Sequence, residues 1–499
     1  MDVEYIVVQA GGKGTRLEHL TKNKPKSLVP INNLPMIFHL FKKFKDKKFI
    51  IIGDYKIDVL KKYLSVFASV EYLVVDASQN KGTCAGIVDA IKLIPNHKGF
   101  MLIWSDLVLS DDFNFPRLNG NYIGLSKGFE CRWKYENKLF EESPSKEYGV
   151  AGLFIFKDKS ELNNVPLSGE FVKWLQQEKK QYDTLDLNGV NEYGLLSVYD
   201  NLGVSKCRPF NRITIKDNKL IKEGIDDQGK KLAIIEKDWY QFIKGKQFNN
   251  IPEIYSFEPF TMEKIDGDNI YNLNLSINDK KVVLESIVKC IKDLHSLGTV
   301  DVDYFDINET YLKKTFDRIN KIRNLVPFAN EKFITINGRK CRNVFFYQNE
   351  LESKINSIVT NKFTVIHGDC TFSNMMVDKG LNPILIDPRG YFGKTQYYGD
   401  LKYDWAKIYY SLVGNYDQFN LKKFRLEIGE QDVKLSIESS GWEDMEDYFL
   451  NLIKDDISRD DIKLMHAIIW LSLTTYAWED YDSICGAFYN GLYYLEEVL

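Results

Sequence analysis

Short apolar runs alternate with helical patterns over roughly the first 206 residues. The apolar runs at 5–8, 49–52, 70–75 and 100–104 are bounded by polar or glycine-containing segments and predict buried strands. Between them, 36–44 and 57–64 have apolar residues at helical spacing. Because strands and helices alternate along the chain, this half predicts an α/β domain with a mostly parallel sheet.

The pattern changes near residue 207. Residues 212–215 and 219–222 each alternate between apolar and polar positions, and Asp217-Asn218 lies between them. Two alternating runs around such a turn predict a β-hairpin. Residues 232–243 then have helical spacing.

Helical patterns dominate the rest of the chain, from residue 279 onward, with one strand-rich segment at 363–387. No repeat and no proline-rich or low-complexity linker separates the halves. The pattern therefore predicts one domain over residues 1–206 and a second over residues 207–499.

Composition narrows the class of protein. The 499 residues exceed the roughly 250–300 that one hydrophobic core usually supports. A net charge of -4 without basic runs argues against a nucleic-acid partner. No apolar run is long enough for membrane insertion, and the seven cysteines lack paired spacing. We expect a cytoplasmic protein that acts on small molecules, and a homo-oligomer remains possible.

The first predicted strand runs directly into a glycine-rich loop. Glycines there let backbone N–H groups approach a phosphate closely, and cationic side chains can neutralise the charge that develops as pyrophosphate leaves. The loop and the segment after it supply these candidates: Gly11, Gly12, Gly14, Thr15, Arg16 and Lys26.

This segment resembles the signature of the sugar-phosphate nucleotidyltransferase superfamily, G-G-x-G-T-R-L with a downstream P-K. The resemblance covers roughly residues 1–206 and implies a Rossmann-like domain. It also implies that a nucleoside triphosphate and a phosphorylated substrate react, with Mg²⁺, to give a nucleotide-linked product and pyrophosphate. Arg16 and Lys26 would be the catalytic cations.

The resemblance extends to residues farther along. Asp106 stands at a strand end where the family places a metal-binding aspartate. The segment 198–203 resembles the part that often carries the second one, which favours Asp200, with Asp186 as the rival. Residues 79–83 resemble the loop that contacts base and ribose, which makes Gln79, Gly82 and Thr83 nucleotide-binding candidates.

The second half carries His367-Gly368-Asp369, then Asn374, then Asp387 after an apolar run. Phosphoryl transfer from ATP needs a carboxylate beside the attacking hydroxyl and groups that bind magnesium. Asp369 is the candidate for the first role, and Asn374 and Asp387 are candidates for the second. His367 is expected to brace the loop.

This pattern resembles the aminoglycoside phosphotransferase and choline kinase families over about residues 207–499. The resemblance implies a two-lobed, protein-kinase-like α+β domain, with a small lobe at about 207–265 and a large lobe at about 266–499. The segment 403–407 matches the families' Y-D-x-A segment, expected to be structural.

A kinase of this kind also needs a lysine on the nucleotide phosphates and a helical glutamate that holds it. Lys222 and Glu236 fit that order, with Lys219 as the runner-up for the lysine. Residues 208–211 stand where a loop would cover the phosphates. Met262 lies where the hinge between the lobes would meet adenine.

Two such halves on one chain suggest consecutive reactions. The kinase would phosphorylate a small hydroxyl compound with ATP, and the transferase would add a nucleotide from a second nucleoside triphosphate, with CTP or UTP preferred. The product would be an NDP-sugar or a CDP-alcohol for surface polysaccharide or lipid synthesis. The alternative is that only one half is catalytic and the other binds or regulates.

Overall fold

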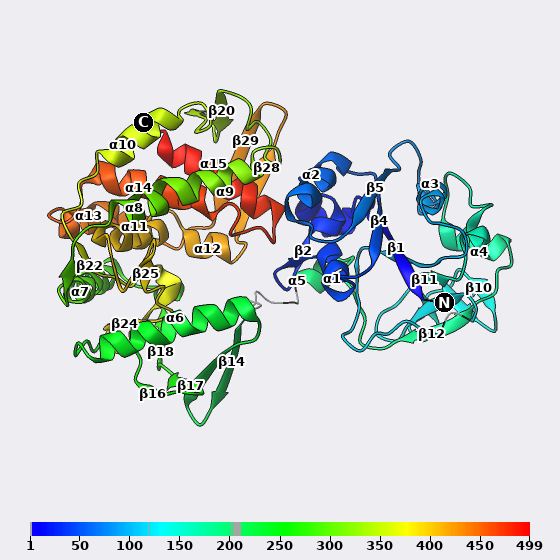
Figure 1. Cartoon of the computed structure of the whole chain (residues 1–499), viewed down its shortest axis with the longest axis horizontal. Coiled ribbons are helices and arrows are strands. Elements are labelled where there is room, and N and C mark those ends of the chain that lie inside the picture. The colour runs from blue at the N-terminus through cyan, green and yellow to red at the C-terminus, as the bar shows by residue number, and fades with distance from the viewer. Residues whose placement is uncertain (1, 118, 201, 203–210) are drawn as a thin grey trace. The chain divides into compact units, whose positions relative to one another are not determined.

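A computed structural model describes residues 2–117, 119–200, 202 and 211–499 of the chain (Figure 1). The chain forms two compact units. Unit 1 comprises Met1–Ser205 together with the short segment Glu479–Asp482, and unit 2 comprises Lys206–Trp478 and Ser483–Leu499. The expected boundary at 206/207 lies outside the described residues.

Unit 1 is built on a nine-stranded sheet. Its parallel part has the order β5-β4-β1-β6, and β11 and β8 then continue the sheet in antiparallel pairing. The strands are β1 Val3–Gln9, β4 Lys48–Gly53, β5 Tyr72–Asp76, β6 Gly99–Trp104, β8 Tyr122–Ser126, β9 Lys134–Glu136, β10 Leu139–Glu141, β11 Gly149–Phe156 and β12 Asp183–Leu187. The expected α/β class with a mostly parallel first half is confirmed.

Five α-helices belong to the described part of this unit, and the first four bury an apolar side, whereas the fifth has no buried residue. They are α1 Met36–Lys43, α2 Ile57–Phe67, α3 Ile87–Lys92, α4 Phe171–Gln177 and α5 Leu196–Asp200. Figure 1 shows β1, β4 and β5 side by side with α2 beside them. Since residues 5–8 of β1 are buried in the middle of the sheet, the loop that follows this strand is held on a rigid base.

Several shorter elements position the loops after the central strands. They are the 3₁₀ helices η1 Thr15–Thr21 and η2 Lys26–Leu28 and the strands β2 Pro30–Ile31, β3 Leu34–Pro35, β7 Leu107–Val108 and β13 Asn191–Glu192. A separate small core of Leu17, Val29, Ile31, Met36 and Tyr193 fixes these elements to one another.

Unit 2 begins with a small lobe, a four-stranded sheet of order β14-β15-β17-β16. Its elements are β14 Asn211–Lys216, β15 Lys219–Gly224, α6 Asp227–Lys244, β16 Ile254–Phe257 and β17 Phe260–Glu263. The predicted hairpin is β14–β15, and its turn residues Asp217 and Asn218 both have positive φ. The predicted helix begins earlier than residue 232, because Asp226 caps it by accepting from the N–H of Gly229.

The large lobe is mainly helical, which confirms the two-lobed α+β architecture. Its helices are α7 Ile277–His295, α8 Tyr304–Ile307, the π-helix η5 Asn308–Lys313, α9 Lys314–Ile322, α10 Gln348–Asn356, α11 Leu401–Leu412, α12 Tyr416–Asn420, α13 Glu446–Ile453, α14 Arg459–Leu473 and α15 Tyr481–Leu495. In the part of the chain that the structure describes, no helix is long and apolar enough to cross a membrane.

Short strands frame the large lobe's central loops. They are β18 Gly267–Asn269, β19 Thr299–Val300, β22 Phe363–Val365, β23 Met375–Asp378, β24 Pro383–Leu385, β25 Tyr391–Phe392, β26 Thr395–Gln396 and β27 Tyr398–Gly399. The strand-rich segment predicted at 363–387 contains β22, β23 and β24.

The expectation of a single strand-rich segment in the large lobe is wrong. A second sheet has the order β21-β20-β29-β28, formed by β20 Phe333–Ile336, β21 Arg339–Arg342, β28 Phe424–Ile428 and β29 Asp432–Ile437. β28 and β29 alternate between apolar and polar residues on either side of a short turn, a hairpin pattern that the sequence analysis overlooked, whereas β21 reads Arg-Lys-Cys-Arg and has no such alternation.

Candidate active sites

The glycine loop of unit 1 lies at the point where the order of the parallel strands reverses. The loop follows β1, and Ser105 and Asp106 follow the neighbouring β6. Open α/β sheets bind ligands outside the carboxyl ends of their strands at such a switch point. The sequence order of the strands therefore brings two predicted groups, the loop and Asp106, to one edge of the sheet.

A different structural constraint explains the lack of a side chain at each of the three glycines of this loop. A Cβ on Gly11 would lie 2.9 Å from the Cβ of Asp54, so this position packs against the end of β4. Gly14 has φ 65° and begins η1, where a left-handed conformation favours glycine. Gly12 has no atom within 4 Å of its ideal Cβ position, so its backbone is open to an approaching ligand.

Four charged side chains meet beside this loop. Lys26 forms an ion pair with Asp106, and its Nζ lies 4.0 Å from Oε1 of Glu192. The guanidinium of Arg16 lies 3.8 Å from the same Glu192 oxygen, and its side chain is 63% exposed. Burial, followed by the negative charge of Asp106, raises the pKa of Glu192.

Strand pairing brings Glu192 into this group. β13 pairs with β7 so that Glu192 lies opposite Leu107, and the N–H of Tyr193 donates to the carbonyl of Asp106 at 3.1 Å. Sequence analysis missed Glu192, because a two-residue strand far along the chain carries no motif. The tertiary pairing, and not a local pattern, identifies this residue.

The two aspartates proposed from the sequence occupy other positions. Asp200 ends α5, which packs near η1 through Val198 and Tyr199, and its side chain is exposed. Asp186 is exposed on β12 and pairs with Lys127 at 3.4 Å. Among the described residues, no ion pair or hydrogen bond joins either of them to the Lys26–Asp106 pair, so the role of Asp200 stays a prediction.

The loop at 79–83 is attached to both β1 and the segment before α4. Gln9 donates to the carbonyl of Thr83 at 2.7 Å, and the hydroxyl of Thr83 accepts from the N–H of Phe171 at 2.8 Å. Gly82 has φ 86°, and a Cβ there would lie 2.3 Å from the carbonyl oxygen of Gly169. Gly82 is thus required for packing within the protein, and Gln79 is exposed beside it.

The catalytic loop of unit 2 surrounds Asp369. His367 braces it as expected, since its Nδ1 accepts from the N–H of Asp369 at 3.3 Å and its Nε2 lies 3.0 Å from the carbonyl of Ile386. Asp404 lies fully buried beneath the loop and accepts from the N–H groups of His367 and Gly368. The structural role predicted for the Y-D-x-A segment fits Asp404.

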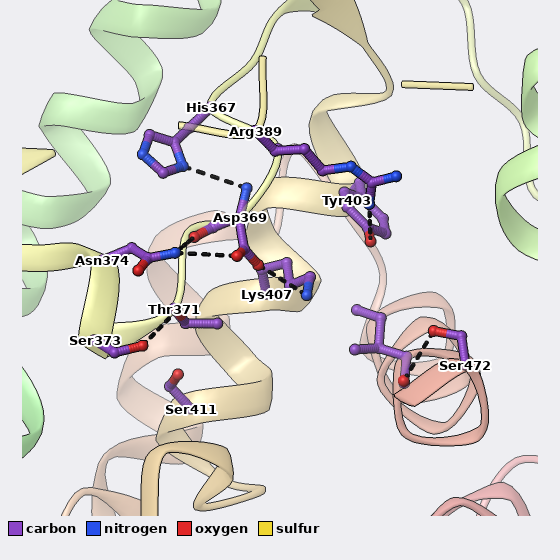
Figure 2. A network of polar contacts seen from close by, with 12 residues as sticks. His367, Asp369, Thr371, Ser373, Asn374, Arg389, Tyr403, Lys407, Ser411 and Ser472 are labelled. Atoms are coloured by element: carbon purple, nitrogen blue, oxygen red, sulfur yellow. Dashed lines mark hydrogen bonds and ion pairs between the residues drawn. The ribbon is translucent and has the colours of Figure 1, made fainter. Parts of the chain in front are cut away.

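Asp369 is contacted on both of its carboxylate oxygens (Figure 2). The amide nitrogen of Asn374 donates to Oδ2 at 3.0 Å, which turns the amide oxygen of Asn374 away from Asp369. Lys407 forms an ion pair with Oδ1 at 2.9 Å. Although burial opposes ionisation, Lys407 holds the pKa of Asp369 below its ordinary value. Lys407 belongs to the segment expected to be purely structural, so its contact with Asp369 was missed.

The small lobe contributes the predicted lysine and glutamate. Nζ of Lys222 lies 2.7 Å from Glu236 and also pairs with Asp387, so Lys222 connects the two lobes of unit 2. Burial opposes the ionised form of Asp387, but Lys222 lowers its pKa. Lys219 instead lies 4.5 Å from the ring of Tyr255 at the edge of the sheet, which favours Lys222 over the runner-up.

Met262, the residue expected at the hinge, belongs to the small-lobe sheet. It is buried on β17, opposite Leu220 of β15. The loop proposed to cover the phosphates, 208–211, lies outside the described residues except for Asn211, which begins β14.

The available oxygen ligands suit magnesium in both sites. Mg²⁺ is usually held by one or two protein carboxylates together with substrate phosphates and water. Each site offers one or two carboxylates of this kind. They are Asp106 and Glu192 in unit 1, and Asp387, together with the amide oxygen of Asn374, in unit 2. Within the described residues, no group of three or more His, Cys, Asp or Glu side chains forms a metal cage.

Comparisons with known proteins match a family model to part of each half. Residues 5–122 match the model of the nucleotidyl transferase family, and residues 232–421 match the model of the phosphotransferase enzyme family. The two resemblances noted in the sequence are thereby confirmed.

Individual relatives match part of the chain. The bifunctional protein GlmU of Methanococcus maripaludis is 24% identical over 252 residues, covering 44% of this chain and 60% of that protein. The D-glycero-alpha-D-manno-heptose 1-phosphate guanylyltransferase of Campylobacter jejuni is 29% identical over 124 residues, covering 24% of this chain and 55% of that protein. The crystal structure of HddC from Yersinia pseudotuberculosis aligns over 40% of this chain and 98% of its own at 19% identity, with a TM-score of 0.35.

Proposed function

We propose that this chain, which joins a nucleotidyl transferase domain to a phosphotransferase domain, carries out two consecutive reactions on one small molecule. The phosphotransferase domain, over about residues 207–499, phosphorylates a hydroxyl group with ATP. The transferase domain, over about residues 1–206, then joins that phosphate to a nucleotide and releases pyrophosphate. The observation that supports the proposal is that each half pairs a carboxylate with a lysine, Asp106 with Lys26 and Asp369 with Lys407, within a segment that matches its family model.

In the first reaction, Asp369 accepts the proton of the acceptor hydroxyl as its oxygen attacks the γ-phosphorus of ATP. The lowered pKa keeps Asp369 ionised and able to accept a hydrogen bond at neutral pH. Lys222, oriented by Glu236, holds the ATP phosphates, and Met262 borders the adenine site. Asn374 and Asp387 would hold Mg²⁺, which neutralises charge that develops on the phosphates.

In the second reaction, the loop from Gly11 to Thr15 supplies backbone N–H groups to the phosphates of the second nucleotide. Arg16 and Lys26 stabilise the negative charge on the departing pyrophosphate. Asp106 and Glu192 would hold Mg²⁺, which would supply positive charge to the reacting phosphates, with Asp200 as the alternative second carboxylate. Gln79, Gly82 and Thr83 border the base and ribose.

The product is a nucleotide-activated sugar or alcohol, of the kind that donates its group to a surface polysaccharide or a lipid. CTP or UTP is the proposed second nucleotide, because the transferase domain is compact and lacks an obvious insertion.

Separate substitutions test the two assignments in the full-length protein. Asp106→Asn should lower pyrophosphate release on the order of 100-fold and leave acceptor-dependent ADP formation near that of the wild type. Asp369→Asn should lower acceptor-dependent ADP formation and leave pyrophosphate release near that of the wild type when the transferase is given a phosphorylated substrate. Asp112→Asn, an exposed loop aspartate near Asp106, is the matched control. Pyrophosphate release that survives Asp106→Asn would remove Asp106 from the site.

A further inference from the structure

Four cationic side chains gather around Tyr403, beside Asp369. Nη1 of Arg389 lies 3.3 Å from the hydroxyl of Tyr403 (Figure 2), and Nζ of Lys314 and of Lys407 lie 5.5 and 5.8 Å from the centre of its ring. Arg318 follows Lys314 by four residues and therefore lies on the same side of α9. We call Lys314, Arg318, Arg389 and Lys407 the cation cluster.

Lys407 alone of the cation cluster is neutralised. It pairs with Asp369, whereas no carboxylate of the described residues lies within 4.0 Å of the nitrogens of Lys314, Arg318 or Arg389. Nε of Arg389 is buried and has no hydrogen-bond partner in that same part of the chain. Among the described residues, Arg318 donates only to the backbone carbonyl of Ser472, and its guanidinium lies 5.8 Å from the centre of the ring of Tyr476.

This arrangement is unfavourable in the absence of a ligand. Burial, and then the charges of Arg389 and Arg318, lower the pKa of Lys314 well below its ordinary value. Like charges four residues apart on a helix repel each other, and an unpaired buried charge costs free energy. An anion bound among Lys314, Arg318 and Arg389 would remove both penalties.

The two oxygens of Asp369 indicate which substrate carries the anion. Oδ2 faces Asn374, which with Asp387 and Lys222 forms the side where ATP and its metal are held. Oδ1 faces Lys407 and hence the cation cluster. The cluster therefore lies on the side of Asp369 that is left for the acceptor.

We propose that the acceptor carries a negatively charged group, a carboxylate or a phosphate, in addition to the hydroxyl that is phosphorylated. Lys314, Arg318 and Arg389 bind this group, and Lys407 lies between it and Asp369. This inference rests on the proposed kinase function of unit 2. It disfavours choline, ethanolamine and other cationic alcohols, because the tyrosines near Asp369 are occupied by the protein's own cations.

Anion binding can be measured without knowing the acceptor. The full-length protein is first saturated with Mg²⁺ and a non-hydrolysable ATP analogue, so that nucleotide phosphates occupy their own site. Malonate and inorganic phosphate are then titrated by calorimetry. Saturable binding of at least one of them is expected, and Lys314→Gln should weaken it about tenfold, as the loss of one direct charge contact implies.

Lys313→Gln is the matched control. Lys313 precedes Lys314, is 57% exposed and pairs with Asp317 at 3.0 Å, so its loss removes the same charge outside the cluster. Removing one of several repelling charges should leave the melting temperature of Lys314→Gln unchanged or raised, which distinguishes lost binding from unfolding. Absence of binding of both anions, or equal effects of the two variants, would overturn the proposal.

A second measurement separates this inference from the proposed function. ADP formation is compared for glycerol, glycerate, glycerol 3-phosphate and choline, and for glucose, glucuronate and glucosamine. The anionic members should be preferred, and the carboxylate and phosphate forms identify which anion is bound. Preferential phosphorylation of a neutral or cationic member would contradict the anionic acceptor while supporting the kinase. Anion binding without phosphorylation of any compound would retain the anion site and count against the kinase assignment.

Discussion

Each half of the chain holds one carboxylate against a lysine: Asp106 against Lys26 and Asp369 against Lys407. Such a pair keeps both groups charged and fixes their positions before substrate binds. When phosphates enter, each lysine has a competing partner, and the carboxylate becomes available to a metal or a hydroxyl. The same carboxylate–lysine ion pair is therefore compatible with both nucleotidyl transfer and phosphoryl transfer.

The second carboxylate of the transferase can be identified by comparing two substitutions. We expect Glu192→Gln to lower pyrophosphate release tenfold or more, because Glu192 contacts the Lys26–Asp106 pair and Arg16. Asp200→Asn should remain within a few-fold of wild type, since its side chain is exposed at the end of α5. Steady-state kinetics at several Mg²⁺ concentrations are the measurement. The opposite ranking would assign the role to Asp200.

The kinase should lose activity as the pH falls through neutrality. Burial raises the pKa of Glu236 to about 7, although Lys222 opposes the shift. The ionised form orients Lys222, so this interaction is present above about pH 7 and is lost as Glu236 takes up a proton. We expect kcat/KM for ATP to fall below about pH 7. Glu236→Gln should lower the activity and abolish this decrease of kcat/KM at acidic pH. If the decrease is unchanged in the variant, another group is responsible for it.

Residues that stand next to one another in the sequence were the ones that could be predicted. The glycine loop and the segment from His367 to Asn374 each place several reacting groups within ten residues, and their spacing alone indicates phosphate chemistry. Glu192, Lys407 and Lys314 could not be found in this way. Glu192 is brought to its site by the pairing of a two-residue strand, and the two lysines by the packing of a helix. Such tertiary contacts leave no local pattern in the sequence.

Secondary-structure elements determine which of these groups meet. The β7–β13 pairing places Glu192, and the faces of α9 and α11 place three of the four cations of the cluster. The β14–β15 hairpin was predictable because its turn residues tolerate positive φ. The β20–β29 pairing was not, because it joins strands about 100 residues apart and the neighbouring β21 has no apolar alternation.

Substitution of Gly82 can test how the loop 79–83 is attached to the rest of unit 1. Gly82→Ala should destabilise unit 1 by about 1–3 kcal/mol, since it combines a positive φ with a collision against the backbone of Gly169. Gly12→Ala is the matched control, because the added methyl group meets no atom within 4 Å. We expect a lowered melting temperature only for Gly82→Ala, and a raised KM for the nucleotide with Gly12→Ala. Equal melting temperatures would contradict the packing role of Gly82.

At the scale of the whole molecule, the two proposed reactions require that one chain bind two forms of the same ligand in two sites. The kinase must bind a free hydroxyl beside Asp369, and the transferase must bind the phosphorylated form beside Asp106. The two activities are then expected to share one acceptor preference.

The central claim is that the product of the kinase is the substrate of the transferase. The most direct measurement supplies ATP, CTP or UTP and an accepted hydroxyl compound to the full-length protein and follows the nucleotide-linked product by mass. The product should form with wild type, be absent with Asp106→Asn or Asp369→Asn alone, and return when the two variants are mixed. If the phosphorylated acceptor accumulates in every case and no nucleotide-linked product appears, the two halves act in separate pathways and the claim is wrong.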